Sequence, residues 1–117
     1  MRAIIVEDEF LAAIHAESAL ERLGIAVLGM AEDTQGALGL AAHKPTLALV
    51  DLNLRDGFTG PLIGAHLAAQ GINVVYVTAN PAQLEGVNPL RSPVLEKPLE
   101  EHKLASTLRS MFQQEQS

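Results

Sequence analysis

The sequence has no cysteine, very few aromatic residues, a shortage of basic residues and no long apolar run. Without cysteine, the 117-residue chain cannot form a disulfide scaffold or a thiolate metal site, and it suits a reducing cytoplasm. Aromatic residues make up only 3%, so aliphatic side chains and alanine must fill the core. The formal net charge of −6 argues against a nucleic-acid-binding surface, which is normally basic. No apolar run approaches the roughly 20 residues of a membrane span, and the start at Met1 shows no signal peptide, so we expect a cytoplasmic protein without membrane contact.

Strand-like and helix-like segments alternate along the chain. Short continuous apolar runs, typical of strands buried in a parallel sheet, occupy residues 3–6, 25–30, 47–50, 72–77 and 93–96. Helical spacing of apolar residues predicts helices at 10–23, from 33–34 to an end before Pro45, at about 61–70 and at 99–112. Three prolines within residues 80–93 allow only a short or irregular fourth helix there, and residues 113–117 are expected to be a frayed tail.

This alternation predicts an α/β fold in which helices cover both faces of a parallel sheet. Right-handed crossovers leave few topologies, and for five strands the doubly wound, flavodoxin-like order 2-1-3-4-5 is a common one. Residues 1–117 are expected to form a single domain of this kind. Its ligand crevice would lie between the first and third strands, at their carboxyl ends.

Polar residues lie where these strands end. Glu7 and Asp8 follow the first strand, Asp51 follows the third, Thr78 follows the fourth and Lys97 follows the fifth. In the predicted strand order the three carboxylates converge, and carboxylates that close repel one another unless a cation neutralises them. A hard divalent ion with oxygen ligands, typically Mg²⁺, fits best.

Asp51 needs a partner or water, because it follows a strand that is expected to be buried on both faces. A dry and unpaired carboxylate there would cost several kcal/mol. A carboxylate can also act as a nucleophile and form an aspartyl phosphate. The metal, the Lys97 ammonium and the Thr78 hydroxyl could each hold one oxygen of a transferred phosphoryl group.

Four short motifs occur in order at the predicted strand ends: VEDE (6–9), LVDLNL (49–54), YVTAN (76–80) and LEKP (95–98). Together they resemble the receiver domain of two-component response regulators, in particular single receiver domains like the chemotaxis regulator. The resemblance implies that Asp51 is the phosphoacceptor, that Thr78 signals its phosphorylation and that Lys97 pairs with the phosphoryl group. The domain would catalyse only its own phosphorylation and dephosphorylation.

The same resemblance implies a metal site and partners. Asp8 would bind Mg²⁺ directly, Glu7 mostly through water, and Asn53 through its backbone carbonyl, with Asp51 as the shared ligand. The phosphoryl group would come from a sensor histidine kinase or a histidine phosphotransfer protein. A downstream protein or an attached effector domain would respond. The family also often has a cis peptide at the step that corresponds to Lys97-Pro98.

The residues alone leave several alternatives open. Glu7, Asp8 and Glu9 could simply cap the first helix, although that requires no acid at the end of the third strand. A flavodoxin-like nucleotide or flavin binder would need a phosphate-cradling loop where this chain has three acids. An aspartyl phosphatase usually carries its paired acids on the first strand. A receiver-like interaction module that is not regulated by phosphorylation is the main alternative, and phosphate retention from a small-molecule donor separates these cases.

Two departures from the family pattern concern the switch. Val94 stands three residues before Lys97, where many receivers carry an aromatic residue, and the segment between Thr78 and Lys97 is a few residues shorter than usual. We therefore expect that an aromatic rotamer change is not used. Phosphorylation would instead reorganise the backbone of about Asn80–Ser92, because low-stability segments commonly supply switching elements.

Overall fold

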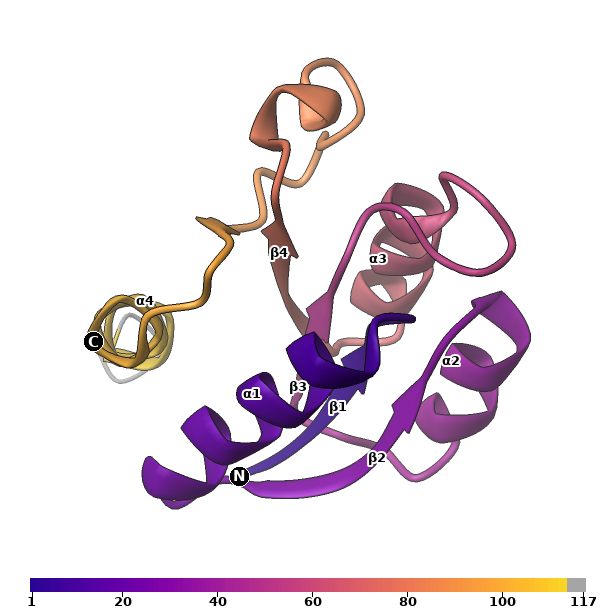
Figure 1. The fold of residues 1–117 in the computed structure, drawn as a ribbon. Coiled ribbons are helices and arrows are strands. Elements are labelled where there is room, and N and C mark those ends of the chain that lie inside the picture. Colours follow the sequence, from indigo (N-terminus) through magenta and orange to yellow (C-terminus); the bar gives the residue numbers. More distant parts are fainter. Residues whose placement is uncertain (114–117) are drawn as a thin grey trace.

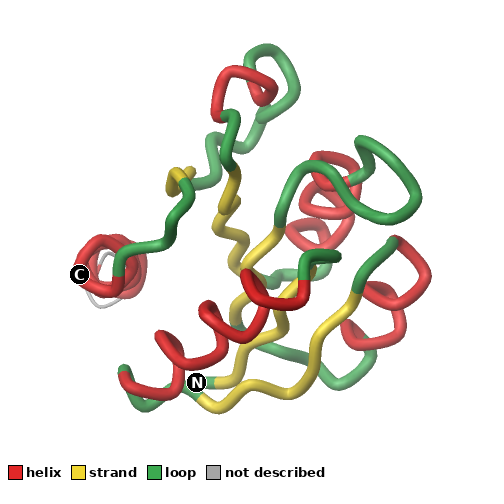
Figure 2. Tube along the Cα trace, viewed as in Figure 1, coloured by secondary structure: helices red, strands yellow, loops and turns green. Residues whose placement is uncertain are grey.

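The computed structural model describes residues 1–113 and contains a five-stranded parallel sheet (Figures 1 and 2). The strands are β1 (Arg2–Val6), β2 (Ala26–Ala31), β3 (Leu47–Val50), β4 (Asn73–Thr78) and β5 (Val94–Glu96). Their spatial order is β2-β1-β3-β4-β5, which confirms the predicted doubly wound, flavodoxin-like topology.

The described residues form four α-helices and one short 3₁₀-helix, and all of these except the last α-helix connect consecutive strands. They are α1 (Phe10–Arg22), α2 (Thr34–Ala41), α3 (Gly60–Ala69), the 3₁₀-helix η1 (Pro81–Leu84) and α4 (Glu101–Gln113). Helices α1 and α4 cover one face of the sheet, and α2 and α3 cover the other (Figure 1). Within residues 1–113, no helix has both the length and the apolar composition needed to cross a membrane.

Two aliphatic cores form, one on each face of the sheet. Ile63 and Leu67 of α3 pack with alternate strand residues on one side, and Leu20 of α1 packs with Leu104 of α4 and the remaining strand residues on the other. Leu47–Val50 is buried throughout, as expected for a central parallel strand that is covered on both faces.

The predicted boundaries of the strands and helices agree with the structure to within about two residues. The second helix ends at Ala41, before Pro45 as predicted, and the last helix begins at Glu101, two residues after the predicted Leu99. The expected short fourth helix is η1, a single 3₁₀ turn. Gln113 belongs to α4 and not to a tail, whereas the rest of the predicted tail, 114–117, lies outside the described residues.

The strand register aligns the carboxyl ends of the central strands. Val6 of β1 pairs with Val50 of β3, which pairs with Tyr76 of β4, which pairs with Val94 of β5. The carboxyl ends of all four strands therefore lie at one edge of the sheet. This edge is where the sequence places its unusual polar residues.

Candidate functional site

Asp51 is held firmly at the point where β3 ends. Its backbone N–H donates to the carbonyl of Val6 (2.9 Å), and its Oδ1 accepts from the backbone N–H of Leu52 (2.7 Å). Oδ2 accepts from Nζ of Lys97 at 3.0 Å. The residue is only 8% exposed, so the carboxylate has the partner that its burial demands.

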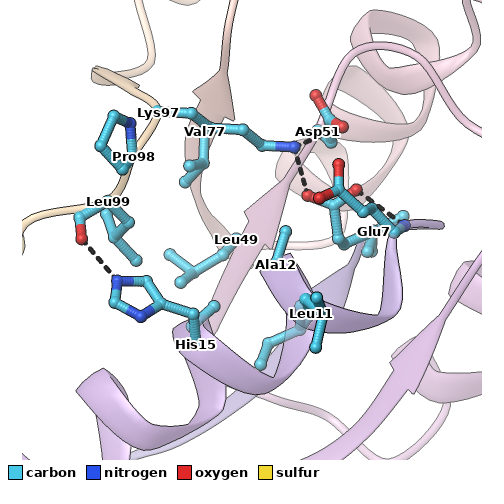
Figure 3. Close-up of a pocket in the computed structure, with 14 residues that line it drawn as sticks. Glu7, Leu11, Ala12, His15, Leu49, Asp51, Val77, Lys97, Pro98 and Leu99 are labelled. Carbon is cyan, nitrogen blue, oxygen red and sulfur yellow. Dashed lines mark hydrogen bonds and ion pairs between the residues drawn. The ribbon is translucent and has the colours of Figure 1, made fainter.

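Lys97 joins two carboxylates. Its Nζ also lies 2.5 Å from Oε1 of Glu7, the residue that directly follows β1, and Figure 3 shows the long side chain reaching across to both acids. Burial favours the neutral amine, but the hydrogen bonds and charges of Glu7 and Asp51 outweigh it and raise the pKa of Lys97 above its ordinary value. The ammonium is therefore fully charged at neutral pH.

Glu7 is a buried acid, which is unusual for this residue type. Burial raises its pKa from 4.5 to about 7, and the negative charge of Asp51 acts in the same direction. The hydrogen bonds from Lys97 and from the backbone N–H of Glu9 (3.1 Å to Oε2) oppose the rise. Two carboxylates and one ammonium thus share a partly dry site.

Asp8 completes a group of three acids. Glu7, Asp8 and Asp51 each place a carboxylate oxygen within 4.8 Å of the others, which is close enough for a single cation to contact all three. Asp8 is exposed, whereas the other two are buried. The possible ligands are all hard carboxylate oxygens. The three negative formal charges exceed the single positive charge of Lys97 by two, which matches the charge of Mg²⁺.

The predicted residues face one open crevice of about 320 Å³. Asp8, Asp51, Asn53, Thr78 and Lys97 all border it, as the sequence predicts. Glu7 is not among the residues that border the crevice, but its carboxylate pairs with Lys97 and lies within 4.8 Å of the carboxylate oxygens of Asp8 and Asp51, which do border it.

Thr78 ends β4 with a side chain that is almost fully buried. Its Oγ1 accepts from the backbone N–H of Asn80 (3.0 Å), which leaves the hydroxyl hydrogen free for an acceptor in the crevice. Its backbone carbonyl accepts from the N–H of Lys97 (2.9 Å) and so fixes the start of the segment that carries the ammonium. The Lys97-Pro98 peptide is cis, as the resemblance implies.

The sequence does not predict two features of the site. Asn53 donates from Nδ2 to Oε1 of Gln83 (2.8 Å), which connects the loop after β3 to η1. Glu9 is the N-cap residue of α1 but makes no side-chain cap hydrogen bond, so it does not cap the helix in that way. No sequence signal identifies Gln83, because its contact depends on how the proline-rich segment folds back.

The comparisons with known proteins agree with this geometry. No family model matches the sequence. The chain is 31% identical over 117 residues to the phyllosphere-induced regulator PhyR of Methylorubrum extorquens, covering 95% of this chain and 44% of the relative. The chain therefore spans less than half the length of the curated relative that it matches.

Several solved structures are also similar to this chain. The receiver domain of the PhyR response regulator from Erythrobacter litoralis has a TM-score of 0.85 at 29% identity, covering 93% of this chain and 87% of that one. SdrG from Sphingomonas melonis Fr1 has a TM-score of 0.79 at 30% identity, covering 96% of both chains. The chain belongs to the receiver domains of response regulators. A further match, PhyR from Bartonella quintana, is an anti-anti-sigma factor; its TM-score is 0.83 at 28% identity, covering 98% of this receiver domain and 49% of that chain.

Proposed function

We propose that this receiver domain accepts a phosphoryl group on Asp51 and acts as a phosphorylation-controlled switch. The position of the Asp51 carboxylate carries the proposal. It follows a buried strand, borders an open crevice, pairs with the Lys97 ammonium and lies close to the acids Glu7 and Asp8. Such an arrangement presents a nucleophile beside positive charge and metal-ligating oxygens.

In the proposed reaction, an oxygen of Asp51 attacks the phosphorus of a phosphohistidine on a sensor histidine kinase or histidine phosphotransfer protein. A P–O bond forms as the P–N bond breaks, and the departing imidazole takes up a proton. Lys97 would pair with one phosphoryl oxygen and the Thr78 hydroxyl would donate to another. Water later attacks the phosphorus, which releases inorganic phosphate and restores the carboxylate. The domain is thus a signal receiver that acts only on itself.

Glu7, Asp8, Asp51 and the backbone carbonyl of Asn53 would hold Mg²⁺. The convergence of three carboxylate oxygens within 4.8 Å supports this assignment, as does the position of Asn53 on the same crevice. Mg²⁺ would supply neutralisation of the phosphoryl oxygens.

The output is proposed to be a protein, either a separate partner or an attached effector domain. The anti-anti-sigma activity of the Bartonella PhyR supports a protein partner of this kind. Residues 1–117 are proposed to act as one receiver unit in the cytoplasm, with no role for nucleic acid or membrane.

Intact-mass spectrometry after incubation with acetyl phosphate or phosphoramidate and Mg²⁺ tests the proposal. We expect one added phosphoryl group on the wild-type protein and none on Asp51→Asn. Asp33→Asn is the matched control, because Asp33 caps α2 away from the crevice and asparagine caps equally well. Equal labelling of the wild type and Asp51→Asn would refute Asp51 as the acceptor.

A further inference from the structure

A second cavity, of about 440 Å³, lies beneath the Lys97 side chain, and the proposed phosphorylation chemistry does not use it. Its floor is the sheet face between α1 and the segment 97–99, where Ile5, Leu49 and Val77 contribute apolar side chains. Figure 3 shows the aliphatic stem of Lys97 extending above this floor toward Asp51. The cavity is therefore apolar below and charged at one end.

Small side chains on α1 create the space. Ala12 and Ala16 line the cavity from the helix, opposite Pro98 and Leu99. Close-packed interiors seldom leave voids larger than a water molecule, whereas ligand pockets usually measure roughly 300–1,000 Å³. A cavity of about 440 Å³ is thus the size of a small-molecule site and too large for a packing defect.

The cavity opens to solvent between α1 and the segment 97–99. Leu11 is 75% exposed at its rim, and His15 closes the far end, where its Nε2 lies 2.8 Å from the carbonyl of Leu99 (Figure 3). Water in such a space finds few polar partners on the apolar floor. An apolar occupant would displace it favourably.

The charged residues at the open end indicate which charge the occupant of the cavity should carry. Glu7, Glu9 and Asp51 line the cavity together with one cation, Lys97. Lys97 is already shared by Glu7 and Asp51. The carboxylate of Glu9 forms no ion pair within residues 1–113 and is exposed to solvent. A positive group at this end would gain a partner, whereas an anionic group would meet an excess of negative charge.

We propose that this cavity binds a small amphipathic cation, an apolar body that carries one amine. The apolar part lies on Ile5, Leu49 and Val77, and the amine pairs with Glu9. Binding requires neither phosphorylation nor metal, so it can be tested separately from the proposed function of Asp51, although Glu7, Asp51 and Lys97 also line this cavity.

Three ligands of similar size and different charge test the proposal: 2-phenylethylamine, 2-phenylethanol and 3-phenylpropionate. Each is titrated into the unphosphorylated protein without Mg²⁺, and methyl and amide NMR shifts are followed. The amine is expected to bind most tightly and to shift the signals of Ile5, Leu49, Val77 and Ala12. The alcohol should bind more weakly and the carboxylate least.

Two variants separate the apolar and charged contributions. Ala12→Leu fills the cavity and should abolish the shifts, whereas Ala69→Leu, an exposed position on α3, should not. Glu9→Gln should weaken amine binding by roughly two- to fivefold, the range of an exposed ion pair, and Glu21→Gln on the same helix should leave it unchanged. Circular dichroism checks folding, and if Ala12→Leu does not fold, the Glu9→Gln comparison decides.

Absence of binding by all three ligands would overturn the proposal and would favour a protein side chain as the occupant of the cavity. Equal affinity for the three, or unchanged affinity in Glu9→Gln, would overturn the assigned charge. Because phosphate labelling is not measured, a failure here leaves the role of Asp51 standing, and the reverse is also true.

Discussion

At the scale of single residues, Lys97 bridges strands that are not neighbours in sequence. Its ammonium contacts acids that follow β1 and β3, and its own backbone is fixed to β4 through the carbonyl of Thr78. Breaking such a set by removing one partner leaves an uncompensated charge in a partly dry site. A phosphoryl group on Asp51 would lie beside the Lys97 ammonium that already pairs with this carboxylate.

Asp56 is a second residue whose charge is held by specific contacts. Its Oδ2 accepts from the backbone N–H of Thr34 (3.0 Å), the first residue of α2, and its Oδ1 accepts from the hydroxyl of Thr59 (2.6 Å), the N-cap of α3. These hydrogen bonds lower the pKa of Asp56 from 3.8 to about 2, although the side chain is exposed. One carboxylate thus connects the starts of two helices.

The stability that Asp56 contributes should disappear in acid. Because the folded-state pKa is below the unfolded value, this contribution is present above about pH 4 and is lost as the pH falls toward 2. Urea unfolding between pH 7 and pH 2 should show a shallower acid limb for Asp56→Asn than for the wild type. Glu21→Gln, which removes an exposed acid without an ion pair in residues 1–113, is the control. An Asp56 carboxyl that titrates near 3.8 by NMR would contradict the prediction.

At the scale of elements, the strands can be predicted because each is a short apolar run between turn residues. The prediction for Leu47–Val50 is correct at both ends, and the strand order then puts Asp8, Asp51, Thr78 and Lys97 at one edge. A packed ring is also expected for Tyr76 from its mid-strand position, and it is confirmed at 3% exposure. The contact between this ring and Gly64 is not predictable from the sequence. The ring fits against α3 only because Gly64 has no side chain, since a Cβ there would lie 2.0 Å from the Tyr76 hydroxyl.

The contact of Gln83 and the cavity beside α1 cannot be predicted from the sequence. The first depends on the path of the backbone, and the second depends on space that neighbouring side chains do not fill. Three prolines exclude a long helix between β4 and β5, but they do not show that Gln83 will meet Asn53. Alanine at positions 12 and 16 is compatible with a packed helix face, and only the observed course of residues 97–99 shows that a cavity remains.

The segment after β4 is attached to the candidate site by two hydrogen bonds. The N–H of Asn80 donates to Oγ1 of Thr78, and Asn53 donates to Gln83 of η1. Both anchors border the groups that a phosphoryl oxygen would contact. Val94, at the position where an aromatic residue is common, is half-buried against the core and too short to swing outward.

Phosphorylation should therefore change the protection of residues 80–92. Hydrogen exchange with and without beryllofluoride, a phosphoryl mimic, is expected to show its largest change there, and Gln83→Ala should reduce that change. Helix α2 lies next to the far edge strand and serves as the internal reference. Unchanged protection across 80–92, with clear changes elsewhere, would mean that the signal leaves by another face.

At the scale of the whole molecule, the fold concentrates negative charge at one edge of its sheet. The chain carries a formal net charge of −6, and three acids converge beside one lysine where β1 and β3 end. The three carboxylates repel one another, which costs free energy in the folded state. The sheet nevertheless keeps them close, because parallel strands that are covered on both faces cannot move apart. A cation that binds only the folded state should relieve this repulsion and stabilise the protein.

Mg²⁺ is accordingly expected to raise the melting temperature, by an amount that corresponds to about 2.7 kcal/mol at 100 times its dissociation constant. Asp8→Asn should reduce this gain more than Glu7→Gln, because the carboxylate of Asp8 is exposed and available, whereas that of Glu7 already accepts from Lys97 and from the N–H of Glu9. Asp33→Asn, which keeps the cap of α2, should respond like the wild type. Calorimetry across a Mg²⁺ series measures all four proteins. A wild-type melting temperature that does not change in millimolar Mg²⁺ would exclude the acids as a metal site. A larger loss of Mg²⁺ stabilisation in Glu7→Gln than in Asp8→Asn would reverse the roles of the two ligands.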